Sequence, residues 1–144
     1  MAPTYGADRF QREIKLKTRS KGCHLVTNEI MAQIEEGVKN TKVGILHLFL
    51  QHTSAALSLN ENCDPDVRTD MDMCLDKIVP ESLPWDHVDE GPDDSVSHSK
   101  SSLIGASVQI PIMNGRLALG TWQGIYLLEF RKLPHSRRIV ATVL

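Results

Sequence analysis

The stretch Val43-Gly44-Ile45-Leu46-His47-Leu48-Phe49-Leu50, followed by Gln51-His52-Thr53-Ser54, decides the fold. Its first eight residues are almost continuously apolar, which predicts a strand buried on both faces. This strand leads into a histidine and two hydroxyl side chains. A short second strand over 56–60 then leads to Asn60-Glu61-Asn62-Cys63-Asp64, so polar groups collect where the strands end. The pattern indicates either a polar site, or a histidine whose ring is hydrogen-bonded within the fold and is followed by an ordinary helix cap.

The segments before and after this stretch predict further elements. Alternating residues over 10–17 and the residues 23–26 predict a hairpin, while residues 1–8 are expected to form a loose tail. A helix is expected from Thr27 or Asn28 to Lys39, because isoleucine and valine recur every four residues. A second helix starts at Asp64-Pro65, carries an apolar stripe that includes Cys74, and ends at Pro80.

The last part of the chain is expected to be mostly strands. A loop over 80–94 is longer than most connections, which is typical of loops that line a site. A short helix starts at Asp94 or Ser95 and ends at Gly105. Asn114-Gly115 is typical of a hairpin turn, and the last two strands are expected to pair with each other. The predicted strands cover 106–112, 116–119, 125–131 and 137–144.

The order of the predicted elements is ββαββααβββ(β), without a repeating βαβ unit. It favours an α+β fold in which helices pack on one face of a mostly antiparallel sheet. The length of 144 residues is typical of one domain, so a single domain over 1–144 is expected.

Composition and charge exclude several classes of protein. A formal net charge of −2 gives no indication of binding to nucleic acid or to a membrane surface. The first residues contain no apolar run, which argues against a signal peptide or a membrane anchor. The three cysteines form no Cys-x-x-Cys pair, which fits a reducing compartment. We therefore expect a cytoplasmic protein.

Three of the six histidines, His52, His87 and His98, lie at a strand end, in a loop and in a helix, among acids and hydroxyls. Three imidazoles from separate elements are what an open zinc-type site needs, with the fourth position left to water or substrate. Nearby carboxylates such as Glu61 and Asp94 would orient the second ring nitrogen. Their spacing matches no local zinc motif. The alternative is an anion-binding site near the helix start at Ser95, formed with Lys100, Ser101, Ser102 and Arg116. Such residues more commonly form a solvent-exposed surface.

Four blocks of the sequence together resemble one known family. They are His52-Thr53-Ser54-Ala55-Ala56-Leu57, Asn60-Glu61-Asn62 with Asp64-Pro65, Glu90-Gly91-Pro92-Asp93-Asp94 with His98, and Gly115–Tyr126, which contains Gly-Thr-Trp-Gln. These blocks resemble the YjbQ family, also called the secondary thiamine-phosphate synthase family, and the likeness runs from about Phe10 to Val143. The chain departs from the family pattern at Ser95-Val96-Ser97 and Ser99, beside His98.

The resemblance implies an α+β fold, a homotrimer, and a polar pocket that carries His52, His87 and His98. It also implies a weak ability to make thiamine phosphate from a pyrimidine diphosphate and a thiazole phosphate, with release of pyrophosphate. Pyrophosphate is a highly charged leaving group that normally needs a metal ion and several cations.

Our leading hypothesis is a metal-dependent enzyme with thiamine-phosphate-synthase-like activity. His52, His87 and His98 would bind a divalent metal, for which zinc is the first choice and magnesium or manganese are the alternatives. Glu61 or Asp94 would orient a ligand or act as general base. The alternatives are a non-catalytic trimeric module that binds a small phosphorylated metabolite, and a metal-dependent hydrolase. For the block 120–124 around Trp122, a structural bulge is the alternative to a role in ligand binding. An ion pair is expected between Glu129 and Arg131, which share one face of a strand. The ligand pocket would be lined by Asn62, Ser101, Arg116, Thr121, Trp122 and Gln123.

Overall fold

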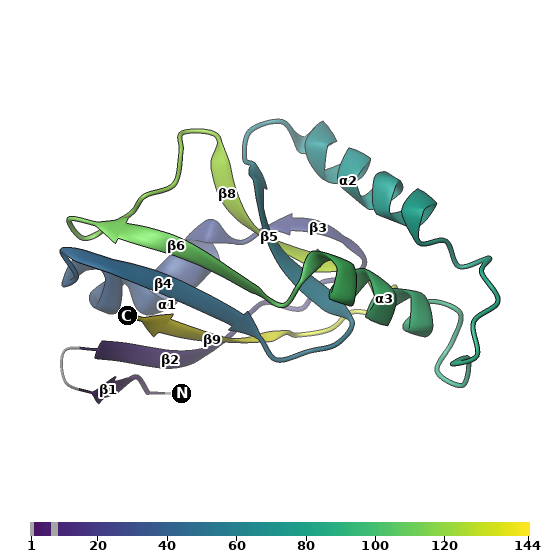
Figure 1. Cartoon of the computed structure of the whole chain (residues 1–144), viewed down its shortest axis with the longest axis horizontal. Coiled ribbons are helices and arrows are strands. Elements are labelled where there is room, and N and C mark those ends of the chain that lie inside the picture. The colour runs from purple at the N-terminus through teal and green to yellow at the C-terminus, as the bar shows by residue number, and fades with distance from the viewer. Residues whose placement is uncertain (1, 7–8) are drawn as a thin grey trace.

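Two antiparallel sheets carry the fold in this computed structural model, which describes residues 2–6 and 9–144 (Figure 1). Within these residues, the larger sheet has the strand order β1-β2-β9-β4-β6-β7 and the smaller sheet the order β3-β8-β5. The elements are β1 (Thr4–Gly6), β2 (Arg9–Lys15), β3 (Gly22–Leu25), α1 (Thr27–Lys39), β4 (Val43–Leu50), β5 (Ala55–Glu61), α2 (Pro65–Ile78), α3 (Asp94–Ile104), β6 (Ser107–Met113), β7 (Arg116–Leu117), β8 (Gln123–Glu129) and β9 (Arg138–Val143).

The α+β class and the antiparallel pairing are confirmed, and the element order matches the prediction once β1 is added. The pairing partners differ from the prediction. β2 pairs with β1 and β9 rather than with β3, and β9 pairs with β2 and β4 rather than with β8. Residues 4–6 of the expected loose tail form β1, while residues 1, 7 and 8 of that tail lie outside the described residues.

The main core lies between the two sheets and includes one face of α1. It joins Ile30, Ile34 and Val38 of α1 to apolar residues of β2, β4, β6 and β9 from one sheet and of β5 and β8 from the other. A smaller cluster on the opposite face of the small sheet joins Leu75 of α2 to Tyr126 and Leu128 of β8. α1 therefore packs between the sheets, whereas α2 and α3 cover the small sheet from outside, so the helices do not all share one face.

Strand β4 is buried on one face only, which corrects the prediction of a strand buried on both. Leu46, Leu48 and Leu50 point into the core, while Val43, Ile45 and Phe49 are exposed. Exposed Pro111 and Met113 of β6 lie opposite Ile45 and Val43 in the register. The outer face of the large sheet therefore carries an exposed apolar patch, consisting of Val43, Ile45, Phe49, Pro111 and Met113.

The helix ends follow the predicted signals in part. Asp64 caps α2 by accepting a hydrogen bond from the backbone N–H of Asp66 at 2.9 Å, and Gly105 ends α3 at a φ of 108°. Thr27 does not cap α1, because its hydroxyl accepts the backbone N–H of Ile125 instead. Cys74 is exposed on α2 rather than part of a core stripe. Only Leu75 of this helix is fully buried.

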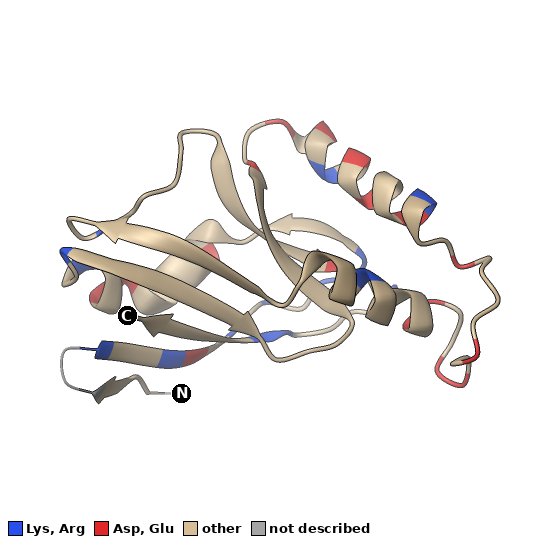
Figure 2. Cartoon of the chain, in the orientation of Figure 1, with Lys and Arg blue, Asp and Glu red and all other residues tan. Residues whose placement is uncertain are grey.

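Figure 2 shows that acidic residues gather on α2 and on the loop that follows it. Lys21 near β3 pairs with both Asp72 and Asp76 of α2 at 2.9 Å, and Lys100 of α3 also pairs with Asp76. These ion pairs connect α2 to the rest of the molecule, where few apolar contacts do so. Among the described residues, no helix has the length and apolar character needed to cross a membrane.

Candidate metal centre

Three side chains meet where the long loop enters α3. Asp94 Oδ2 lies 2.6 Å from His87 Nε2 and 3.2 Å from His98 Nε2, and the two imidazole rings are 5.4 Å apart between centroids. One ligand atom of each residue lies within 4.8 Å of the others. Asp94 is buried, His98 is half-buried and His87 is exposed, so the group opens to solvent on the His87 side.

The local sequence explains why these three groups meet. Asp94 and His98 are four residues apart on α3, so they share one face of the helix. Gly91 has a φ of 104°, a conformation that favours glycine, and lets the loop turn back into the helix. Within the loop, the indole Nε1 of Trp85 donates to the carbonyl of Pro80, which supports the segment that carries His87.

Arg131 holds the other oxygen of Asp94. Its guanidinium donates to Asp94 Oδ1 at 2.5 Å and lies 3.3 Å from Asp93 Oδ2. Burial raises the pKa of Asp94, but the hydrogen bond with His87 and the charges of His98 and Arg131 outweigh burial and hold this pKa below its usual range. Asp94 is therefore an ionised carboxylate with both oxygens engaged, which fits a metal ligand better than the general base that we predicted.

The ring of His98 is oriented by a backbone carbonyl. Its Nδ1 lies 2.7 Å from the carbonyl oxygen of Thr53, which can only accept a hydrogen bond, so Nδ1 carries a proton. In the neutral ring the lone pair is then on Nε2, the nitrogen that faces Asp94. Metal-binding histidines are commonly oriented in this way, with the second nitrogen donating to a carbonyl or carboxylate.

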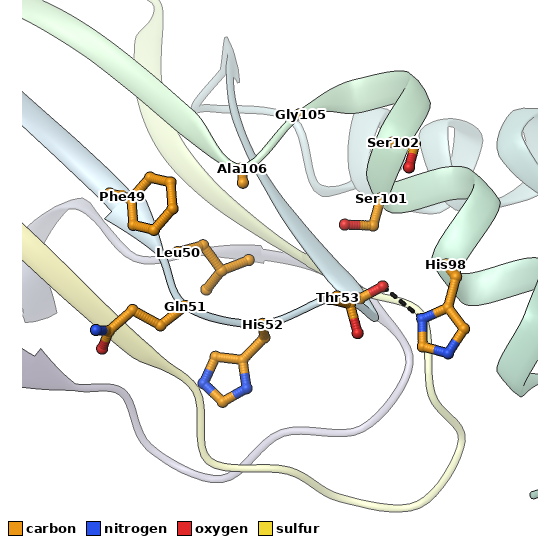
Figure 3. A pocket seen from close by; sticks show the side chains of 10 residues that line it. All are labelled: Phe49, Leu50, Gln51, His52, Thr53, His98, Ser101, Ser102, Gly105 and Ala106. Atoms are coloured by element: carbon orange, nitrogen blue, oxygen red, sulfur yellow. Dashed lines mark hydrogen bonds between the residues drawn. The ribbon is translucent and has the colours of Figure 1, made fainter.

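A hollow of about 1030 Å³ lies beside this group, and His98 forms part of its wall. Figure 3 shows His98 and Thr53 joined at one end of the hollow, with Ser101 and Ser102 above them on α3. Two predicted metal ligands, His52 and His98, and one predicted pocket residue, Ser101, thus line the same space. The lining residues are Phe49, Leu50, Gln51, His52, Thr53, His98, Ser101, Ser102, Gly105 and Ala106.

His52 lines the hollow but does not belong to the group formed by His87, Asp94 and His98. Its Nε2 accepts the backbone N–H of Arg138 at 2.8 Å. Burial and the charge of Arg137 lower the pKa of His52. The structure thus brings two of the three predicted ligands, His87 and His98, together with Asp94, and leaves His52 at the side.

A buried ion pair bonds Ser54, the residue that follows Thr53. Arg137 donates to both oxygens of Glu129 at 2.6 Å, and also to the hydroxyl and carbonyl of Ser54. Glu129 and Arg137 are almost completely inaccessible to solvent. The predicted partner of Glu129, Arg131, instead pairs through its side chain with Asp93 and Asp94.

The structure separates the other predicted site residues from this group. β5 runs from Ala55 to Glu61, so Glu61 lies about 20 Å from the His52 end of the strand at about 3.3 Å per residue. Glu61 accepts the backbone N–H groups of Cys63 and Asp64, and Asn62 donates to the carbonyls of Thr121 and Gln123. These groups stabilise turns at the far end of the small sheet.

Trp122 and Gln123 lie at that same far end. Gln123 accepts the backbone N–H of Gly120, while the indole of Trp122 is 62% exposed. With Asn62 they line a separate hollow of about 440 Å³. Arg116 is exposed on β7, beyond the distant end of β6, so it lies about 20 Å from the hollow beside His98.

Sequence reasoning assigned Arg131 to Glu129 instead of Asp94, and it missed the carbonyl of Thr53. The adjacent acids Asp93 and Asp94 indicate that a cation is needed, but several arginines and lysines are candidates. A backbone carbonyl leaves no side-chain signal at all. The contact of Arg131 with Asp94 and that of Thr53 with His98 therefore required the tertiary structure.

Comparison with known proteins gives one consistent result. The model of the family described as "UPF0047 protein YjbQ-like" matches residues 12–144. The chain is 48% identical to the UPF0047 protein YjbQ of Escherichia coli O157:H7, across 93% of this chain and 96% of that protein. It is 42% identical to the UPF0047 protein YugU of Bacillus subtilis, across 83% and 88%. A crystal structure of an uncharacterised YjbQ/UPF0047 protein from Clostridium acetobutylicum matches with a TM-score of 0.81 and 38% identity, across 92% and 99%.

Proposed function

Because the chain belongs to the YjbQ (UPF0047) family, whose activity its relatives' names leave open, we propose a function from the site itself: a metal-dependent enzyme that acts on a small phosphorylated metabolite. The supporting observation is the position of Asp94 Oδ2 opposite Nε2 of both His87 and His98. Because His98 Nδ1 already donates to Thr53, the Nε2 lone pair of the neutral ring faces the carboxylate. Two electron-rich groups facing each other need a cation to offset their repulsion, either a proton or a metal ion.

The donor set fits zinc best. Two imidazoles and one carboxylate are the ligands of many catalytic zinc sites, whereas magnesium and manganese favour oxygen ligands. His87, His98 and Asp94 would hold the ion, and the exposed side of the group would leave room for a substrate. A bound zinc ion would supply a Lewis acid for a phosphoryl oxygen. Arg131 would keep Asp94 ionised and oriented.

The specific reaction that we propose is thiamine-phosphate-synthase-like: joining a pyrimidine diphosphate to a thiazole phosphate with release of pyrophosphate. The family resemblance is its main support. The hollow of about 1030 Å³ beside the metal-binding group has room for two such reactants. The hydroxyls of Ser101 and Ser102 could contact their polar groups. Glu61 and the Asn62–Gln123 group lie too far away to take part from the same chain.

A metal-dependent phosphate hydrolase is the second candidate, and the charge of the hollow favours it. Among the described residues, neither lysine nor arginine lines this hollow. Two arginines that contact the residues around it are already paired: Arg131 with Asp93 and Asp94, and Arg137 with Glu129. Arg138, whose backbone N–H bonds the His52 ring, has an exposed side chain that is not among the lining residues. A wall without free cations is better suited to one phosphate group than to a departing pyrophosphate.

We also propose that the protein is a cytoplasmic homotrimer. The apolar patch on the outer face of the large sheet supports contact between copies, because such patches on a lone subunit usually mark an interface. The free cysteines Cys23, Cys63 and Cys74, two of them exposed, suit a reducing compartment.

Elemental analysis tests the metal site first, on protein purified without a metal-affinity column or chelator. We expect about one zinc ion per chain, lost in His98→Ala and in Asp94→Asn. His24→Ala is the matched control, because this ring bonds its own neighbouring loop at Ser20. Absence of metal in the wild-type protein, even after incubation with zinc or manganese, would contradict the proposal.

Activity assays on the metal-loaded protein then separate the candidates. Formation of thiamine phosphate from the two heterocyclic phosphates supports the transferase, and release of inorganic phosphate from simple esters supports the hydrolase. A rise in Tm with these phosphates but no turnover would instead indicate a non-catalytic binding module.

A further inference from the structure

The two nitrogens of the His52 ring have different environments. Nε2 accepts the backbone N–H of Arg138 at 2.8 Å. A backbone amide only donates, so Nε2 must present its lone pair to Arg138 and is not available to a proton or a metal ion. In the neutral ring the single proton is therefore on Nδ1.

The backbone holds this arrangement in place. Gln51, the residue before His52, donates its N–H to the carbonyl of Arg138 at 3.1 Å, so the His52 segment and the start of β9 are bonded in both directions. The ring is half-buried, and burial together with the charge of Arg137 lowers its pKa, so the neutral form dominates at neutral pH. His52 thus keeps one ring N–H without a change of tautomer.

The position of His52 indicates what this N–H does. His52 lines the same hollow as His98, one residue from the carbonyl that orients the His98 ring (Figure 3). Apart from the two histidines, the polar side chains that line this hollow are the amide of Gln51 and the hydroxyls of Thr53, Ser101 and Ser102, all of them neutral. A ligand oxygen in this hollow would meet neutral donors rather than paired cations.

We propose that His52 does not bind the metal but donates its Nδ1–H to a phosphoryl oxygen of the ligand. This inference rests on the proposed function, because it takes the ligand to be phosphorylated. It replaces the three-histidine metal site expected from the sequence with two histidines and Asp94 for the metal, and one histidine for the substrate.

Metal content and phosphate binding distinguish these roles. In zinc-loaded protein, titration calorimetry with inorganic phosphate should show about tenfold weaker binding for His52→Ala, the value of one good hydrogen bond. His52→Asn, which keeps an amide N–H near the position of Nδ1, should recover part of that loss. Both variants should retain the zinc content of the wild type, unlike His98→Ala.

Nitrogen-15 NMR of histidine-labelled protein tests the tautomer directly. We expect His52 in the Nδ1–H form, with ring nitrogen shifts that do not move when zinc is added, while Nε2 of His87 and His98 does move. Loss of zinc in His52→Ala, a proton on Nε2, or unchanged phosphate binding in His52→Ala would each overturn the inference. If zinc binds neither wild type nor variant, the proposed function fails, whereas the tautomer and the phosphate affinity of the metal-free protein still decide the role of His52.

Discussion

Single residues decide how charge is tolerated inside this protein. Glu129 and Arg137 are buried almost completely, and Arg137 reaches both carboxylate oxygens of Glu129 and the oxygens of Ser54. Such a pair need not stabilise the fold relative to apolar residues, but each partner makes the other tolerable. Through Arg137 the pair also bonds Ser54, the residue after Thr53, whose carbonyl orients His98.

Arg137→Ala should therefore destabilise the protein strongly. The variant leaves the Glu129 carboxylate buried without its partner, and we expect a loss of about 3–5 kcal/mol in the free energy of unfolding in urea. Arg138→Ala is the control, because this neighbouring arginine is exposed and its ion pair with Glu13 is long, at 4.0 Å. This substitution should change the free energy of unfolding by no more than about 0.5 kcal/mol. Combining Arg137→Met with Glu129→Leu should recover much of the loss. Equal effects of the two arginine variants would contradict this account.

Residue types alone predicted part of the candidate site. His87, Asp94 and His98 could be found because histidines and acids cluster around a long loop and a helix start. Glu61 and Asn62 carry the same chemical groups but stabilise a turn, and this use cannot be distinguished in sequence from a catalytic one. The role of His52 depended on which ring nitrogen meets the backbone of Arg138, information that only the tertiary structure contains.

At the scale of elements, local signals located the helices and strands well but did not determine their partners. The Asp64-Pro65 start of α2, the Gly105 end of α3 and the turn at Asn114-Gly115 depend on nearby residues and were predicted correctly. Strand pairing depends on segments far apart in the chain, such as β2 with β9. The apolar run of β4 predicted two buried faces, but one face is exposed on the single chain. Apolar residues at an exposed surface patch and apolar residues in a core look the same in the sequence.

Gly37 illustrates packing between elements. Glycine weakens a helix by about 1 kcal/mol relative to alanine, yet a Cβ at this position of α1 would lie 2.5 Å from Phe10 Cδ1 of β2. We expect Gly37→Ala to lower the free energy of unfolding by about 1–2 kcal/mol, because overpacking outweighs the gain in helix propensity. In a Phe10→Leu background the same substitution should cost less. If Gly37→Ala raised the free energy of unfolding, β2 would have to shift away from α1 without cost, which would contradict this account.

The attachment of α2 should depend on pH through Asp76. Burial raises the pKa of this carboxyl, but hydrogen bonds from Lys100 and Lys21 outweigh burial, so its pKa is lowered on folding. Its contribution to stability is then complete above the pKa of the unfolded chain and is lost as the pH falls through the folded pKa. Asp76→Asn should thus be less stable than wild type at pH 7, and the difference should vanish toward about pH 3. Thermal unfolding of both proteins, with Asp70→Asn on the exposed side of α2 as control, measures this; a difference that persists in acid would contradict it.

At the scale of the whole molecule, the two sheets place polar groups at opposite ends of the β5–β8 pair. The His87–Asp94–His98 group lies at one end and the Asn62–Trp122 turn at the other, about 20 Å apart. Within one chain the residues predicted for a single pocket are divided between these two ends, because blocks that are close in sequence lie at either end of one strand. The prediction of the fold class does not depend on this separation, since it rests on the order of the elements and not on where their ends meet.

The apolar patch on the large sheet should govern assembly. Val43 is 87% exposed and Ile45 40%, so Ile45→Lys should prevent association of copies, and Val43→Lys should weaken it. Analytical ultracentrifugation should show a trimer for the wild type and a monomer for Ile45→Lys. Leu103→Lys, at an exposed position of α3, is the control and should remain trimeric. A monomeric wild type, or a trimeric Ile45→Lys, would contradict the proposed interface.

The positions of the two tryptophans have a practical consequence. Trp85 lies in the loop that carries His87, bonded to Pro80, and Trp122 lies exposed in the turn before β8. Replacing Trp122 with phenylalanine leaves a single indole emitter two residues from a proposed zinc ligand. The intrinsic fluorescence of that variant then follows the loop alone, so ordering of the His87 segment can be timed by stopped flow without an attached dye.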